Sequence, residues 1–150
     1  MNINMRQANI DDLDGILDLY AQPDFDNESV LTESEAKTVF AEFSKYPNYR
    51  LFVALDGVRL IGTFALLVMH NLGHRGTPSA IAEDVVVSRA YQGKGIGRIM
   101  MAHAIDLARQ AGCYKLVLSS NLKRKNAHVF YESLGFTQHG LSFVINTQHE

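Results

Sequence analysis

The chain has 150 residues, of which 47% are hydrophobic and 20% are charged, and its formal net charge is -2. A chain of this length can form one domain whose hydrophobic core is stable without disulfides or a structural metal. We therefore expect a single domain over residues 1–150. The near balance of 14 basic and 16 acidic residues argues against a nucleic-acid or anionic-membrane partner. The one cysteine, Cys113, excludes an intrachain disulfide and a cysteine-based zinc site.

The distribution of apolar residues predicts neither a membrane span nor a signal peptide. No window approaches the roughly 20 apolar residues that a span needs. The first residues also lack an apolar segment of signal-peptide length. We therefore expect a cytoplasmic protein.

The N-terminal third predicts one strand followed by two helices. Residues 2–8 form the expected strand, and Asn9 is placed to cap a helix over residues 10–20. Thr32 and Glu35 form a capping box at the start of the second helix. The segment between the two helices breaks the apolar periodicity and is expected to be a loop.

Three strands are predicted next. Residues 49–55 and 59–70 flank Asp56-Gly57, which is a strong hairpin signal. Residues 80–88 form the next strand, which ends in three consecutive valines.

The last third alternates helices and strands. A glycine-rich turn leads to a helix that ends at Gly112, and strands are expected at residues 114–120 and 141–146, with a short helix over 124–136 between them. The order predicts an α/β (α+β) fold with a mixed sheet and helices on both faces. The strands on either side of the long helix are expected to be parallel neighbours.

The glycine-rich turn predicts an anion site. A strand that feeds such a turn at the start of a helix presents backbone N–H groups and the positive end of the helix dipole to one place. Glycines allow an anion to approach the backbone closely, and amide and cationic side chains add donors. The residues concerned are Gln92, Gly93, Lys94, Gly95, Ile96, Gly97 and Arg98.

Two well-known phosphate-binding motifs fail on this turn. In the P-loop motif the lysine precedes Ser or Thr, but Lys94 precedes Gly95. The dinucleotide motif needs a third glycine where Arg98 stands. The pattern that remains is Q-x-x-G-x-G.

Two segments resemble the landmarks of the GNAT superfamily of N-acetyltransferases. "EDVVVSRAYQGKGIGRIMM" is similar to the family's acetyl-CoA signature, and "LVLSSNLKRKNAHVFYESLGF" is similar to its second landmark. The resemblance implies a GNAT fold with a mostly antiparallel sheet of six to seven strands, which splay apart at the coenzyme site. It also implies acetyl-CoA as co-substrate, no metal, and a homodimer.

The resemblance assigns the acetyl-CoA contacts to three places. The glycine-rich turn holds the diphosphate, and a strand N–H within the three valines polarises the thioester carbonyl. Further contacts are expected from the start of the last helix, although Arg124 stands where the family often has Asn. The residues outside the turn are Val85, Val86, Val87, Asn121, Arg124 and Asn126.

The resemblance also names the residues that move protons. Tyr131 matches the tyrosine that protonates the leaving thiolate in family members that use one. Glu83 and Asp84 are the candidate bases, and a water chain is a third alternative. Successive strand residues point to opposite faces, so only one of the two carboxylates is expected to face the cleft directly.

The acceptor is the least defined part. The resemblance implies transfer to the primary amine of a small molecule by direct attack. The acids within residues 24–35 are expected to favour a cationic amine, and His70 and His74 flank a loop that borders the acceptor in this family. The alternatives are acetylation of a protein N-terminus or lysine, and a non-catalytic acyl-CoA sensor.

Overall fold

The computed structural model describes residues 1–148 in two compact units, of which the first is Met1–Leu118 and the second begins at Ser119. The expectation of a single domain over the whole chain stays a prediction. Among the described residues, no helix is long and apolar enough to cross a membrane.

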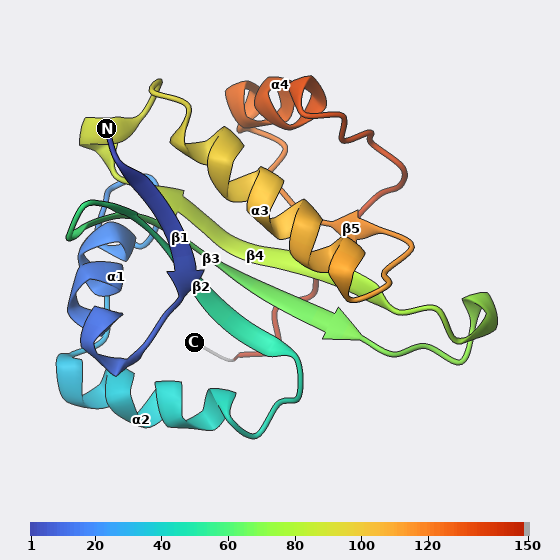
Figure 1. The fold of residues 1–150 in the computed structure, drawn as a ribbon, viewed down its shortest axis with the longest axis horizontal. Coiled ribbons are helices and arrows are strands. Elements are labelled where there is room, and N and C mark those ends of the chain that lie inside the picture. The colour runs from blue at the N-terminus through green and yellow to red at the C-terminus, as the bar shows by residue number, and fades with distance from the viewer. Residues whose placement is uncertain (149–150) are drawn as a thin grey trace. The chain divides into compact units, whose positions relative to one another are not determined.

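The first unit contains five strands and three α-helices (Figure 1). Short 3₁₀ turns precede α1, the β4 strand and the glycine-rich turn. In chain order the elements are β1 (Ile3–Gln7), α1 (Leu13–Tyr20), α2 (Glu33–Phe43), β2 (Tyr49–Asp56), β3 (Arg59–Met69), β4 (Ser79–Val87), α3 (Ile96–Gln110) and β5 (Leu116–Val117). Both predicted caps are confirmed, because Asn9 and Thr32 each form a capping box.

The strands form one mixed sheet in the order β1-β2-β3-β4-β5. The first three pairs are antiparallel, and β4 pairs in parallel with β5 across the α3 crossover. The mixed, mostly antiparallel sheet and the parallel neighbours around the long helix are therefore confirmed.

The expected number of six to seven strands is wrong for residues 1–148, which hold five. Residues 141–146 form no strand, and their apolar side chains are largely exposed, with Phe143 at 87%. The predicted strand over residues 114–120 is reduced to β5, with two residues. An alternating apolar pattern fits a pleated surface, but a strand also needs a neighbouring backbone to pair with, which the pattern does not specify.

Helices cover both faces of the sheet, as predicted. On one face α1 and α2 pack against Leu51, Val53 and Leu55 of β2, and Ile16 belongs to the same buried cluster. On the other face α3 crosses β3 and β4 (Figure 1). There the His103 ring lies 5.7 Å from the Phe52 ring. Alternate residues of β2 thus serve two different cores.

An ion pair fixes the passage from β1 into α1. Arg6 donates from Nη1 and Nη2 to the two carboxylate oxygens of Asp12, at 2.7 and 2.8 Å. The Asn9 backbone N–H donates to the same carboxylate at 2.7 Å. The Arg6 hydrogen bond is the main cause of the lowered pKa of Asp12, whose side chain is only 9% exposed. The carboxylate therefore links the end of β1 to the first turn of the helix.

Candidate functional site

The glycine turn (residues 92–98) adopts a backbone that its sequence requires. Gly93 and Gly95 have φ angles of 76° and 84°, in the left-handed region that favours glycine. Gly95 is also the N-cap of α3. A Cβ at either glycine would meet nothing within 4 Å, so the backbone here faces open space. An anion can therefore approach the start of a 15-residue helix.

The side chains of the glycine turn have different roles from one another. Ile96 is only 1% exposed, so its side chain belongs to the core and only its backbone can bind a ligand. Lys94 Nζ lies 5.2 Å from the centroid of the Tyr91 ring. The Gln92 amide donates to the Val87 carbonyl at 3.3 Å. Gly97 and Arg98 lie in the first turn of α3.

A β-bulge interrupts β4 just before the valines. The register pairs Thr63 with Val86 and Ala65 with Glu83, so two β4 residues, Asp84 and Val85, lie opposite the single residue between Thr63 and Ala65. Asp84 has a φ of 52°, which is unusual for a residue that is not glycine. Bulges of this kind redirect side chains and are frequent near active sites.

The charges of the two carboxylates at the bulge act on nearby tyrosines. Glu83 pairs with Ala65, which lies in the core on the α1–α2 face. Asp84 lies close enough to Tyr20, at the end of α1, to raise the pKa of its phenol, after the larger effect of burial. Burial, followed by the charges of Asp84 and Glu83, raises the pKa of Tyr49. The charges of both carboxylates therefore act on tyrosines of this face. Which of the two faces the site stays a prediction.

The pKa of the Asp84 carboxyl is raised above its ordinary value. The surrounding protein displaces water from it and raises its pKa, and the nearby charge of Asp26 raises it further. A raised pKa makes a carboxylate a better proton acceptor near neutral pH. Its position in the bulge and this shift make Asp84 a candidate base, and the choice between Asp84 and Glu83 stays a prediction.

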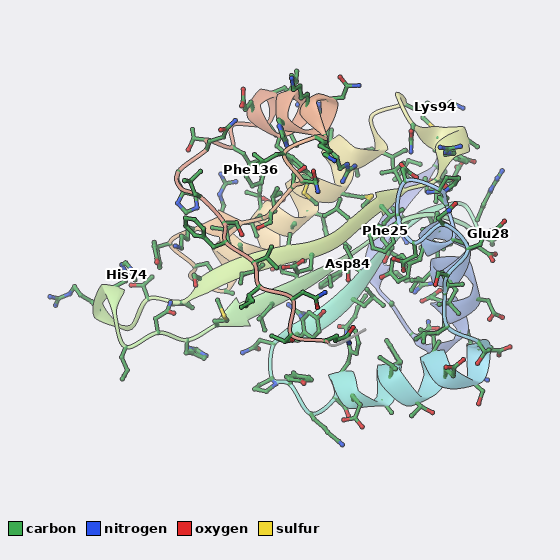
Figure 2. All side chains as sticks on the ribbon, turned by 180° about the vertical axis from the view of Figure 1, so that it is seen from behind. Phe25, Glu28, His74, Asp84, Lys94 and Phe136 are labelled. Atoms are coloured by element: carbon green, nitrogen blue, oxygen red, sulfur yellow. The ribbon has the colours of Figure 1, made fainter. Side chains whose placement is uncertain are left out.

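Asp84 interacts electrostatically with side chains from three other segments, namely Tyr20, Asp26 and Tyr49. The Phe25 and Tyr20 rings stack with their centroids 4.8 Å apart. Figure 2 shows Asp84 beside the segment that carries Phe25. We call this group the acid–aromatic cluster; its members are Tyr20, Phe25, Asp26, Tyr49, Glu83 and Asp84.

The edge of β4 beside the valines has no strand next to it among residues 1–148. The pairing between β4 and β5 ends at Ile81 and Val117. Val86 is 7% exposed, so its side chain is part of the core, whereas Val85 and Val87 are partly exposed. Backbone groups along residues 82–87 can therefore meet an extended ligand on this edge.

Tyr131 and the remaining acetyl-CoA candidates lie in the second unit. Tyr131 is on α4 (Lys125–Ser133), and its ring is 5.8 Å from that of Phe136. Burial raises the pKa of the Tyr131 phenol, and the charge of Arg124 opposes that shift. The phenol is therefore protonated at neutral pH, as a general acid must be.

The other candidates in this unit surround the start of α4. Arg124 is the N-cap of the helix, and Asn126 lies in its first turn. The Asn121 side chain accepts a hydrogen bond from the Lys123 backbone N–H at 2.9 Å, so it is part of a local turn. The roles of all three residues toward acetyl-CoA stay predictions.

Sequence reasoning missed the aromatic half of the acid–aromatic cluster. Tyr20 and Tyr49 end one helix and begin one strand, positions that carried no motif. His74 lies at the outer tip of the β3–β4 connection, away from Asp84 (Figure 2), and the hypothesis for His70 and His74 stays a prediction. The His74 ring packs 4.4 Å from that of Tyr114.

Comparison with known proteins identifies the family. The profile of the acetyltransferase (GNAT) family matches residues 13–136, so this chain belongs to that family. A glucosamine 6-phosphate N-acetyltransferase from Trypanosoma brucei brucei is 35% identical over 54% of this chain and 53% of its own length. The chain thus matches only about half of that relative.

Two further relatives agree with this assignment. An aminoalkylphosphonate N-acetyltransferase from Salmonella typhimurium is 34% identical over 65% of this chain and 63% of its own length. A solved structure from Agrobacterium tumefaciens, named for a presumed acetyltransferase activity, has a TM-score of 0.89 and 37% identity. It covers 96% of this chain and 99% of its own.

Acetyl-CoA is the typical donor of this family, and the residues present fit it. The open, left-handed glycines at the start of α3 suit a diphosphate, and the unpaired edge of β4 suits an extended arm. When bound, acetyl-CoA would supply an activated acetyl group as a thioester. Residues 1–148 contain no cluster of three or more His, Cys, Asp or Glu that could hold a metal ion.

Proposed function

We propose that this protein transfers the acetyl group of acetyl-CoA to the primary amine of a small cationic molecule by direct attack. The observation that carries the proposal is the β4 bulge at Asp84, whose charge acts on Tyr20 of the stacked Tyr20–Phe25 pair. A cationic amine is attracted by the carboxylates, and aromatic faces stabilise cations.

In this proposal the glycine turn binds the diphosphate, and the β4 edge orients the acetyl-bearing arm. Backbone N–H groups near the valines polarise the thioester carbonyl. Asp84 removes a proton from the acceptor ammonium, which makes the nitrogen a nucleophile. Its raised pKa keeps this proton transfer from being strongly unfavourable.

The proton and bond changes balance. The amine nitrogen forms a bond to the acetyl carbon as the carbon–sulfur bond breaks, and the leaving sulfur takes the phenol proton of Tyr131. The nitrogen then loses a second proton, and Tyr131 recovers one from solvent. The products are an N-acetyl amine, coenzyme A as its thiol, and one net proton.

The charges around Asp84 argue for a particular acceptor. Asp26, Glu83 and Asp84 are all acidic, so a phosphate or phosphonate placed among them would be repelled. The acceptor proposed here therefore differs from the anionic amines for which the two curated relatives are named. It is expected to be a diamine, an aminoglycoside or a similar polycation.

The test is acetyl-CoA-dependent release of coenzyme A with a panel of acceptors. The panel contains polyamines, aminoglycosides, glucosamine 6-phosphate, aminoalkylphosphonates and short peptides. The proposal expects the fastest turnover with polycations. Preference for peptides would instead support a protein acetyltransferase, and saturable acetyl-CoA binding without turnover on any amine would support a sensor.

A further inference from the structure

The side chain of Gln22, just beyond the end of α1, connects two segments that are far apart in sequence. Its Nε2 donates to the Val87 carbonyl at 3.2 Å, and its Oε1 accepts from the Arg89 backbone N–H at 2.8 Å. These bonds span 65 and 67 residues. Val87 is the last residue of β4, and Arg89 begins the short 3₁₀ turn that leads to the glycine turn. The amide therefore fixes the chain where it leaves the sheet.

The Val87 carbonyl receives a second amide donor. Gln92 Nε2 also donates to this oxygen, at 3.3 Å. Gln92 is one of the residues proposed to hold the diphosphate, which needs the same amide donor. When Gln92 turns to a ligand, the bond from Gln22 keeps the Val87 carbonyl satisfied, and an orphaned carbonyl is costly when it is removed from water.

The backbone of Gln22 organises the acid–aromatic cluster. Its carbonyl accepts from the backbone N–H groups of Phe25 and Asn27, at 3.0 and 3.1 Å. Asn27 and Glu28 have φ angles of 51° and 69°, so this segment turns tightly through conformations that such residues seldom adopt. The turn carries Asp26, whose charge acts on Asp84. The side chain of Gln22 therefore bonds to the chain that enters the glycine turn, and its backbone carbonyl holds the turn that carries Phe25 and Asp26.

We propose that Gln22 is a positioning residue that couples the glycine turn to the segment at residues 23–28. Binding of coenzyme A at the glycine turn strengthens the hydrogen bonds of the Gln22 side chain to the Val87 carbonyl and the Arg89 N–H. Because the same residue holds the Phe25–Asn27 turn, that segment becomes ordered beside Asp84 before the amine binds. This inference rests on the proposed function, since it takes the glycine turn as the coenzyme A site.

Coenzyme A alone is the probe, so no acceptor needs to be known. Its affinity is measured by calorimetry for the wild type, Gln22→Ala and Gln22→Glu. Gln22→Glu keeps the size of the side chain and an acceptor for the Arg89 N–H but loses the donor to Val87. Gln110→Ala, at an exposed position at the end of α3, is the matched control. Loss of the two bonds should weaken coenzyme A binding about tenfold in Gln22→Ala.

Amide hydrogen exchange over residues 23–28 supplies the readout that a merely structural role would not change. We expect coenzyme A to slow exchange of these amides in the wild type and in Gln110→Ala. In both Gln22 variants the slowing should be lost, even though the folded protein still binds coenzyme A at saturating concentration. This test does not depend on measuring kcat or KM with acetyl-CoA.

Two outcomes would overturn the inference. If the Gln22 variants melt at a lower temperature but bind coenzyme A as the wild type does, with the same slowing of exchange, Gln22 has only a structural role. In that case the proposed function is unaffected. If the wild type itself does not bind coenzyme A, the proposed function fails and the coupling fails with it.

Discussion

The glycine turn and the acid–aromatic cluster are neighbours along the proposed reaction path but are built in different ways. The turn is one continuous segment, in which Gly93 and Gly95 provide backbone angles that other residues resist. The cluster brings together side chains from α1, the following loop, β2 and β4. In the proposed function, donor binding therefore depends on local backbone conformation, whereas acceptor selection depends on tertiary register.

The largest expected effect on kcat comes from replacing Asp84 in the acid–aromatic cluster. Replacing Asp84 with Asn removes the proposed base and should lower kcat about 100-fold or more. Coenzyme A affinity should not change. Because the pKa of Asp84 is raised, the wild-type rate should fall with decreasing pH above the range in which an ordinary aspartate titrates. Asp84→Asn should lack this dependence in a pH–rate profile.

Glu83→Gln is the matched control for that experiment. It alters the adjacent carboxylate, and we expect it to keep most of the rate. The opposite result, a large loss with Glu83→Gln and a small one with Asp84→Asn, would move the role of base to Glu83. Small losses with both would indicate a water chain.

Tyr131 extends the comparison to the second unit. Tyr131→Phe removes the proposed acid and should also lower kcat about 100-fold, with little change in coenzyme A affinity. The raised pKa of the phenol should keep the wild type active toward alkaline pH. Tyr114→Phe, which alters a partly exposed tyrosine of the first unit, is the control. An unchanged rate for Tyr131→Phe would remove this residue from the mechanism.

Gly95→Ala tests the glycine turn, and its expected effect is smaller. An added Cβ has open space, so the cost comes from the φ of 84° rather than from a clash. That strain amounts to about 1–2 kcal/mol, or roughly tenfold in coenzyme A affinity. Calorimetry measures it, and kcat at saturation should change little. Gly73→Ala, at a residue with φ of -61° and equally open space, should bind as the wild type does.

The smallest effect on activity is expected at the β1–α1 ion pair, which supports the face that carries the cluster. Arg6→Met leaves the Asp12 carboxylate without its cation and should lower the free energy of unfolding by about 1–3 kcal/mol. The pKa of Asp12 is lowered in the folded state, so its contribution is present above the unfolded pKa and is lost as the pH falls through the folded one. Arg6→Met should lose stability less steeply in acid.

Lys37→Met provides the matched comparison for Arg6→Met. The Lys37–Glu33 pair has an N–O distance of 3.1 Å, but both side chains are at least half exposed. Its loss should cost far less, because solvent screens an exposed pair. Equal losses in thermal or urea unfolding would show that the Arg6–Asp12 pair contributes no more than a surface contact.

Most of the elements could be predicted from the sequence, because their signals are local. Asn9 and Thr32 cap helices, and a hairpin forms at Asp56-Gly57, where Asp56 ends β2 and Gly57 begins the two-residue turn. The segment at residues 141–146 was mispredicted as a strand because propensity does not supply a pairing partner. The β4 bulge could not be predicted from the sequence pattern, because alternation describes an unbroken ladder and does not show where one strand carries an extra residue.

The sequence by itself determined the donor side of this protein. Glycines at alternate positions before a helix restrict the backbone locally, and that restriction can be recognised without the rest of the fold. Only the tertiary structure decided the acceptor side. Three features define it: the β4 bulge, the stacking of Phe25 on Tyr20, and the hydrogen bond from Gln22 to the Val87 carbonyl. Each of them joins residues that are separated in the sequence. Their geometry therefore follows from packing and strand register rather than from local preference.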